Sequence, residues 1–154
     1  MADSLRQRLV EKVETRMATI TVANGYRTNA GSNVAVWRVA SWDQDELPCI
    51  NIRDLVDRVD ESRAGTQRLH RLLGFELEVM VKESGEAAAE TTRHVVADIQ
   101  EAIGTDEKWD SLAMLTTYES DELDSDQRER KMAGAMVRFT IHYHQGRWEP
   151  DTVR

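Results

Sequence analysis

Two histidines separated by one residue form the most chemically suggestive pair in this chain. His142 and His144 lie where polar residues alternate with apolar ones, namely Val137, Phe139, Ile141 and Tyr143. Residues two apart in a strand point to the same side, so both imidazoles could share a metal ion with Glu76 or Glu78 if those strands pair. Because no spacing fixes a further ligand, we favour an ordinary wet strand face and keep a small metal-dependent hydrolase as the least favoured alternative.

Other clusters have equally ordinary explanations. Glu90, His94 and Asp98 recur every four residues, as on the solvated ridge of a helix. Cys49 lies beside Ile50 in an apolar segment, which favours a small buried side chain over a nucleophile. The acidic turn lacks the glycine and the distal glutamate of a calcium-binding EF-hand; its residues are Asp121, Glu122, Asp124 and Asp126. Phosphate-binding and nucleophile-elbow motifs are absent, so we predict no catalytic, cofactor-binding or metal-binding residue.

Composition narrows the class of protein. The 154 residues are 40% hydrophobic and 31% charged, which suits one folded domain, and the net charge is −8. An acidic chain is a poor duplex binder, because nucleic-acid affinity comes largely from cationic side chains. A lone cysteine precludes an internal disulfide, and the apolar stretches are too short for a signal peptide or a membrane span.

Hydrophobic periodicity predicts the elements. A spacing near four, begun by a capping Ser4, predicts a first helix with an apolar face made of Leu5, Leu9, Val13, Met17 and Ile20. A second helix is expected over 85–104. Strands are expected at 34–40, 47–54, 73–81, 113–119 and around 137–144, with exposed loops at 55–67 and 120–126.

The order of these elements is αβββαββ, which predicts an α+β fold. We expect a two-layer domain over residues 1–146, in which two helices cover one face of a mainly antiparallel or mixed sheet of about five strands. Residues 147–154 form a C-terminal tail without periodicity. The polar strand positions then make an uncovered face that meets water, a channel or another copy: Glu76, Glu78, Arg138, Thr140, His142 and His144.

The tryptophans and arginines suggest contact surfaces. Trp37 lies in an expected strand and should be in the core, whereas Trp42 and Trp148 lie in polar segments where exposed tryptophans often anchor interfaces. Five arginines are spread among acids, which favours salt links at an interface over a nucleic-acid patch: Arg53, Arg58, Arg63, Arg68 and Arg71.

Several short sequence segments, in order along the chain, resemble the tail terminator family of long-tailed bacteriophages, which includes the lambda-type minor tail protein U. The segments are Gly25-Tyr26, Asn33-Val34, Trp37-Arg38, Asp45-Glu46-Leu47-Pro48, Ile50-Asn51-Ile52-Arg53-Asp54, Ala102-Ile103-Gly104-Thr105-Asp106 with Trp109, and 133–143. None is a catalytic motif. The resemblance covers almost the whole chain and rests on the order and spacing of packing and turn residues.

The resemblance implies a non-enzymatic virion protein without cofactors. Such a protein forms a ring, expected to be a hexamer, at the head-proximal end of the tail, and it is assembled in the host cytoplasm. Its partners would be its own copies, the tail tube protein and the neck or connector protein, with DNA only as passing cargo and no membrane. Another neck or head-tail completion ring protein is the alternative.

The exposed connections are our own candidates for contacts in such a ring, since loops on a rigid sheet commonly carry recognition. The candidate interface residues are Trp42, Asp43, Asp45, Glu46, Arg58, Arg63 and Trp148. An acidic ring would also repel phosphates and let DNA slide through.

Overall fold

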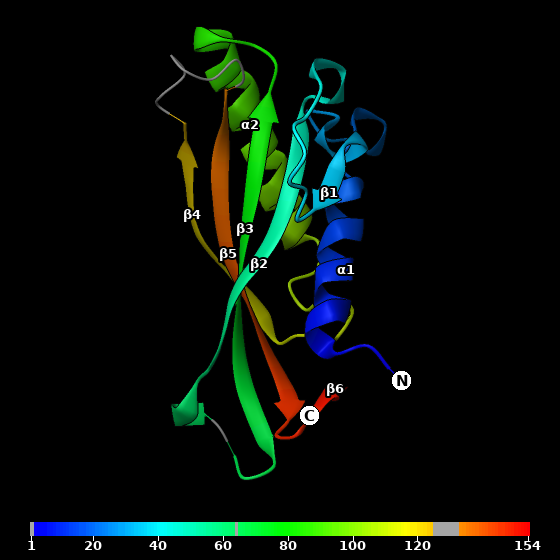
Figure 1. The fold of residues 1–154 in the computed structure, drawn as a ribbon, viewed down its shortest axis with the longest axis vertical. Helices are drawn as coiled ribbons and strands as arrows, with labels where there is room; N and C mark the ends of the chain where they lie inside the picture. The colour runs from blue at the N-terminus through cyan, green and yellow to red at the C-terminus, as the bar shows by residue number, and fades with distance from the viewer. Residues whose placement is uncertain (1, 64, 125–132) are drawn as a thin grey trace.

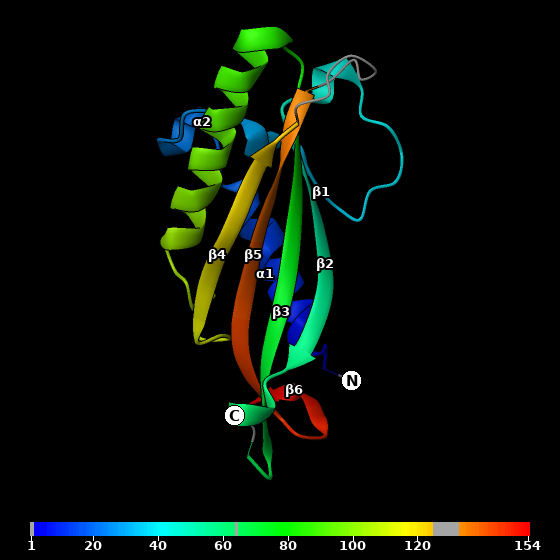
Figure 2. The same cartoon turned by 90° about the vertical axis from the view of Figure 1, so that its left-hand side faces the viewer.

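The computed structural model describes residues 2–63, 65–124 and 133–154, which form a long sheet with two helices against one of its faces (Figures 1 and 2). The predicted α+β class and two-layer arrangement are confirmed. Among the described residues, no helix has the length and apolar character needed to cross a membrane.

The first helix, α1 (Leu5–Ala18), follows the predicted periodicity. The Ser4 hydroxyl accepts a hydrogen bond from the Gln7 backbone N–H at 3.1 Å, which caps the helix start. All five residues of the predicted apolar face, Ile20 just beyond the helix included, are completely buried. The second helix, α2 (Gly85–Gly104), buries Ala88, Val95, Ile99 and Ile103 as predicted.

The sheet is mixed and has six strands. They are β1 (Val34–Val36), β2 (Cys49–Val59), β3 (Arg68–Val81), β4 (Leu115–Leu123), β5 (Ala133–Gly146) and β6 (Glu149–Val153). Their order is β1-β2-β3-β5-β4, with β6 pairing the end of β5. β1 is parallel to β2, and the other pairs are antiparallel. The β3–β5 ladder runs through fourteen register pairs, from Arg68↔Gly146 to Val81↔Ala133, and forms the centre of the sheet.

Alternation along the central strands separates the two faces. Leu73, Phe75, Leu77 and Val79 of β3 pack with both helices in the main core, and they meet Val137, Phe139 and Ile141 of β5. The intervening side chains point to the opposite face, which we call the open face: Arg53, Glu76, Glu78, Arg138, Thr140, His142 and His144. The polar strand face predicted from sequence is therefore present.

A second, small cluster of buried residues lies on the open face at one end of the sheet. Trp42, Leu47 and Cys49 pack there against Ala35 and Met80. The chain between β1 and β2, which contains the short 3₁₀ helix Gln44–Glu46, supplies this cover. One end of the open face is thus covered by a loop rather than by a helix.

Three expected boundaries are wrong. β1 ends at Val36 because Trp37 adopts a left-handed backbone conformation with φ 53°, which no strand continues. Residues 55–59, expected as loop, extend β2 beyond a bulge between Asp54 and Asp57 that places Leu55 and Val56 outward. β3 already begins at Arg68, so the connection is shorter than the expected 55–67 loop.

Two further regions contain more strand than their composition suggests. β4 continues through Leu123 into the segment expected as a charged turn, and a bulge between Tyr118 and Ser120 breaks its alternation. Residues 125 and 126 of that turn lie outside the described part of the chain. Residues 149–153 of the expected tail form β6.

Candidate interaction surfaces

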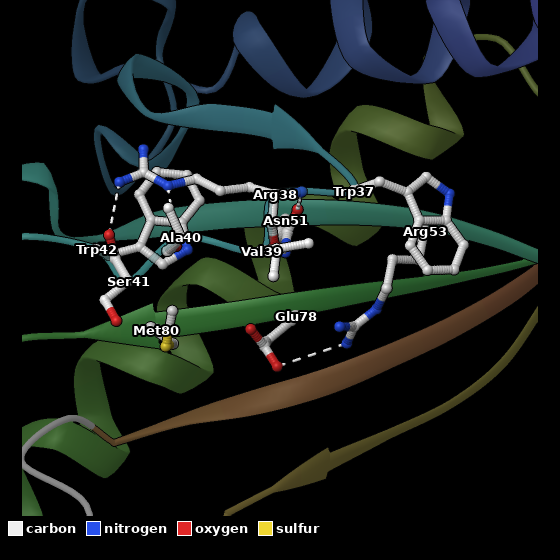
Figure 3. Close-up of a pocket in the computed structure, with 10 residues that line it drawn as sticks. All are labelled: Trp37, Arg38, Val39, Ala40, Ser41, Trp42, Asn51, Arg53, Glu78 and Met80. Carbon is white, nitrogen blue, oxygen red and sulfur yellow. Dashed lines mark hydrogen bonds and ion pairs between the residues drawn. The ribbon is translucent and has the colours of Figure 1, made fainter.

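A shallow groove lies on the open face where the chain after β1 passes over β2 and β3 (Figure 3). Asn51, Arg53 and Glu78 line it from the strands, and Trp37 and Val39 line it from the chain after β1. Val39 is 97% exposed and Trp37 is 50% exposed. The groove therefore combines exposed apolar groups with the ion pair between Arg53 and Glu78.

Arg38 holds the wall of this groove in place. Its guanidinium binds both carboxylate oxygens of Glu46, at 3.1 and 2.9 Å, and donates to the carbonyls of Ala40 and Ser41. It also stacks on the Trp42 ring at 4.0 Å. The hydrogen bonds from Arg38, together with one from the Asp43 backbone N–H, lower the pKa of Glu46. One arginine therefore organises the whole connection between β1 and β2.

Asn51 ties the same connection to the sheet. Its side-chain amide donates to the Arg38 carbonyl at 2.9 Å and accepts from the Arg38 backbone N–H at 3.0 Å. The Trp37 N–H still donates to the Ile52 carbonyl at 2.9 Å, and the buried Asn51 amide then satisfies the backbone groups of Arg38, the next residue. Sequence reasoning missed this role, because alternation places Asn51 on the polar side of its strand but does not show that the backbone of Arg38 lies against it.

Trp37 does not lie in the core, contrary to the sequence prediction. It is 50% exposed, and its indole N–H donates to Asp54 Oδ1 at 2.8 Å. Asp54 also accepts from Arg6 of α1 at 2.7 Å. Burial raises the pKa of Asp54, but the hydrogen bonds from Trp37 and Arg6 outweigh it and lower the pKa overall. The left-handed backbone at Trp37 turns its side chain out of the core.

Trp42, in contrast to Trp37, is buried, although its polar surroundings predicted an exposed tryptophan. It is 7% exposed, because Arg38 covers its ring and Cys49 packs in the same cluster. Cys49 is fully buried, as predicted, and burial raises the pKa of its thiol to about 12. A thiol of that pKa stays protonated at neutral pH and is a poor nucleophile.

The carboxylates proposed as partners of the histidine pair are engaged elsewhere. Glu76 binds Arg53 at 3.3 Å and Arg138 at 3.1 Å, and Glu78 lies 3.5 Å from Arg53. Glu76 pairs in register with Arg138, whereas His142 pairs with Leu72, four residues away along β3. Glu76 and Glu78 therefore form a charge ladder with arginines and do not join His142 and His144.

The two histidines instead meet a third that the sequence did not single out. The His70 and His144 rings lie edge to face with Nδ1 and Nε2 3.1 Å apart, and His142 stands 5.7 Å from His70 between ring centroids. His142 also contacts the Thr117 hydroxyl at 3.0 Å. Burial, reinforced by neighbouring positive charge, lowers the pKa of all three imidazoles. His70 is 1% exposed, and its Nε2 has no hydrogen-bond partner within the described residues.

Three exposed arginines lie near these histidines: Arg58 pairs in register with Leu72, which in turn pairs with His142, Arg68 lies two residues before His70 on β3, and Arg63 lies in the connection between β2 and β3. Arg63 lowers the pKa of all three histidines, Arg68 that of His70 and His144, and Arg58 that of His142. Arg58 and Arg68 make no ion pair with any residue that the structure describes, and Arg63 is 3.9 Å from Asp60. We call this surface the arginine-histidine patch: Arg58, Arg63, Arg68, His70, His142 and His144.

The remaining candidate interface residues lie near the two ends of the sheet. Asp43, Asp45 and Glu46 precede the start of β2, at the end where Cys49 pairs with Met80. Trp148 lies at the other end, in the turn between β5 and β6, and is 87% exposed. The Arg147 backbone N–H donates to the Gln67 carbonyl at 3.0 Å, so this turn is fixed to the β2–β3 connection.

The ridge on α2 and the acidic turn do not form ion sites in the described part of the chain. Asp98 is completely buried and accepts hydrogen bonds from the Thr28 N–H and hydroxyl, while Glu90 and His94 are exposed. No group of three or more His, Cys, Asp or Glu side chains suited to a metal occurs over residues 2–63, 65–124 and 133–154.

The fold is that of a two-layer α+β domain built on a mixed sheet. No protein-family model matches the chain, and no curated protein matches it in sequence. Among solved structures, the chain is similar to one in a structure titled "Virion of native gene transfer agent (GTA) particle", with a TM-score of 0.49 and 12% identity over 92% of each chain. A similarity of this extent carries no argument about function, which must come from the chain itself.

Proposed function

We propose that this protein is a structural component of a tailed phage or phage-like particle that forms a ring on the end of the tail tube. In this role it ends tube polymerisation and presents the surface that joins the neck or connector. The ring, expected to be a hexamer, works without catalysis or a cofactor. DNA passes through it as cargo.

The observation that carries the proposal is the separation of two oppositely charged surfaces on one sheet. Asp43 and Asp45 precede β2, and Arg58 lies near its far end. The eleven residues of β2 span about 35 Å at ~3.3 Å per residue. A closed ring needs two different surfaces on each subunit, because each copy must offer one surface to the next copy and another to the previous one.

The sequence segments that resemble the tail terminator family support the same role. Trp37-Arg38 and Asp45-Glu46 supply the arginine and the carboxylate that fix the chain between β1 and β2. The segment 50–54 supplies Asn51, which anchors that chain to the sheet, and Asp54, which binds the Trp37 indole. These residues fix the conformation of the loop that presents Asp43 and Asp45, and a fixed surface loop suits a protein that assembles with others.

A different neck or head-tail completion ring is the second candidate, since it has the same requirement for paired surfaces. Particles made without this protein distinguish the two by electron microscopy. A terminator is supported by tails of irregular, excessive length. Tails of normal length that fail to attach to heads would contradict termination and favour a joining protein.

Native mass spectrometry of the purified protein tests the ring directly. We expect a six-subunit species that grows with concentration and does not depend on divalent cations. A metal-dependent monomer with hydrolytic activity would contradict the structural role.

A further inference from the structure

The arginine-histidine patch has more positive charge than its surroundings neutralise. Arg58, Arg63 and Arg68 are exposed, and within the described residues only Arg63 has a carboxylate within ion-pair distance, that of Asp60 at 3.9 Å. In a chain with a net charge of −8, this concentration of cations on one area of one face is a marked exception. Such a surface attracts an acidic partner at long range and orients it on approach.

A second feature of the patch is the unpartnered Nε2 of His70. Buried polar atoms are almost always hydrogen-bonded, and an exception requires a physical explanation. His70 lies at the base of the patch, where its ring contacts the rings of His142 and His144. The positive charge of Arg63 also acts on it. Because His70 is buried within one subunit, it gives the exposed arginines a base of low dielectric constant, where their charge is screened less than in water.

The chain itself has a surface complementary to this patch. Asp43 and Asp45 are exposed in the 3₁₀ turn before β2, and neither makes an ion pair with a described residue. Arg38 and Glu46 hold the loop that presents them in one conformation, so little conformational entropy would be lost on contact. These carboxylates lie at the far end of β2 from Arg58, so one molecule cannot bring them onto its own patch.

We propose that the arginine-histidine patch of one copy binds the Asp43 and Asp45 loop of the next copy, forming the head-to-tail contact between subunits. This inference rests on the proposed ring and specifies the residues that close it. The contact is heterologous, with different surfaces on the two sides, and therefore generates either a closed ring or an open filament. The partner is a second copy rather than a nucleic acid, because the chain as a whole is acidic and repels phosphates.

A charge-swap experiment with the full chain tests the contact. The first variant is Arg58→Glu with Arg63→Glu, and the second is Asp43→Arg with Asp45→Arg. In each variant alone, like charges face each other across every contact, so we expect association to weaken at least 100-fold by sedimentation velocity at low salt. In an equal mixture opposite charges face each other again, so we expect alternating oligomers within about tenfold of the wild-type affinity. Wild-type association should also weaken between 50 and 500 mM salt.

A matched control reverses two charges outside the contact. Arg93→Glu with Lys108→Glu changes the net charge as the first variant does, but both residues are exposed and lie outside the patch and the acidic loop. It should associate like the wild type, and circular dichroism should show that all variants are folded.

The outcomes distinguish a failure of the proposed contact from a failure of the proposed function. A wild-type ring unaffected by either double variant, or an inert mixture, overturns the contact and leaves the ring intact. A wild-type protein that stays monomeric up to millimolar concentration at low salt also overturns the contact, and tail length in particles then judges the function independently. Binding of a short DNA duplex at 150 mM salt, lost in Arg58→Glu with Arg63→Glu, would instead identify the patch as a phosphate-binding surface.

Discussion

Buried charge at individual residues fixes the chain between α1 and β1. Asp98 of α2 is completely buried and accepts from the Thr28 N–H at 2.9 Å, from the Thr28 hydroxyl at 2.8 Å and from Arg27 at 3.1 Å. A carboxylate in such a position is stabilising only while its donors stay in place. Asp98 therefore acts as an anchor for this loop rather than as part of a solvated ridge.

Replacing this anchor should be costly. Asp98→Ala leaves the Thr28 N–H without a partner, so we expect a loss of about 2–4 kcal/mol in the free energy of unfolding, measured by urea denaturation. Glu101→Ala removes an exposed partner of the same Arg27 and should cost less than about 1 kcal/mol. Equal losses in the two variants would show that Asp98 is not the anchor.

The histidine cluster should make stability depend on pH. Burial keeps the pKa values of His70, His142 and His144 below the ordinary value of 6.5. As the pH falls, the histidines of the unfolded chain take up protons before those of the folded chain. The free energy of unfolding is therefore unaffected by these histidines above about pH 6.5 and declines below it. Urea denaturation at pH 7.5, 6.5 and 5.5 should show this decline, with a smaller slope for His70→Gln. A slope unchanged in that variant would exclude His70 as a contributor.

The same residues show where sequence reasoning ends. The alternation in β5 was enough to place His142 and His144 on one face. The partner His70 was not predictable, because it lies 72 and 74 residues earlier and the β3–β5 register alone brings it near. Trp37 and Trp42 were misplaced for a related reason: a left-handed backbone at one and an arginine stacked on the other decide their exposure.

At the scale of elements, regular periodicity was predictable and its interruptions were not. Both helices and the centre of β3 follow patterns that burial of an apolar face enforces. The extensions of β2 and β4 lie beyond bulges, each of which shifts the alternation so that the strand no longer resembles one in sequence. The loop after β1 depends on Arg38, Asn51 and Glu46, whose contacts cross from one element to another.

Packing between elements predicts one sensitive glycine. A Cβ on Gly31 would lie 2.5 Å from the Met17 carbonyl oxygen and 2.7 Å from the Ile20 backbone nitrogen. Gly31→Ala should therefore separate the 3₁₀ helix Ala30–Ser32 from the end of α1 and lower the thermal midpoint by several degrees. Gly65→Ala is the control, because nothing lies within 4 Å of its Cβ position. Matching midpoints for the two variants would rule out this close approach.

At the scale of the whole molecule, the surfaces available for partners are distributed along the sheet. The acidic loop and the arginine-histidine patch serve neighbouring copies in our proposal, and Trp148 remains for a different partner at the hairpin end. Arg147 ties its turn to the Gly65 carbonyl at 3.1 Å and to Gln67, so Trp148 projects from a fixed base. The domain boundary at residue 146 stays a prediction, although β6 shows that the tail adds a strand to the sheet.

Within the proposed function, Trp148 provides a test of attachment that is separate from ring formation. Trp148→Ser should leave folding and oligomer size unchanged but reduce the yield of complete particles at least tenfold, because an exposed aromatic contact with the tube or neck would be lost. Val22→Ser, also at an exposed apolar residue, is the control. Normal particle yield with Trp148→Ser would exclude this residue from attachment.

The long β3–β5 ladder has a mechanical consequence. Its fourteen register pairs span both the part of the sheet that the helices cover and the hairpin that extends beyond them. In an antiparallel ladder the hydrogen bonds lie across the strand axis, so tension applied along that axis from opposite ends loads them together in shear rather than one after another. The molecule should therefore be stiff along its length and weaker to peeling at its edges.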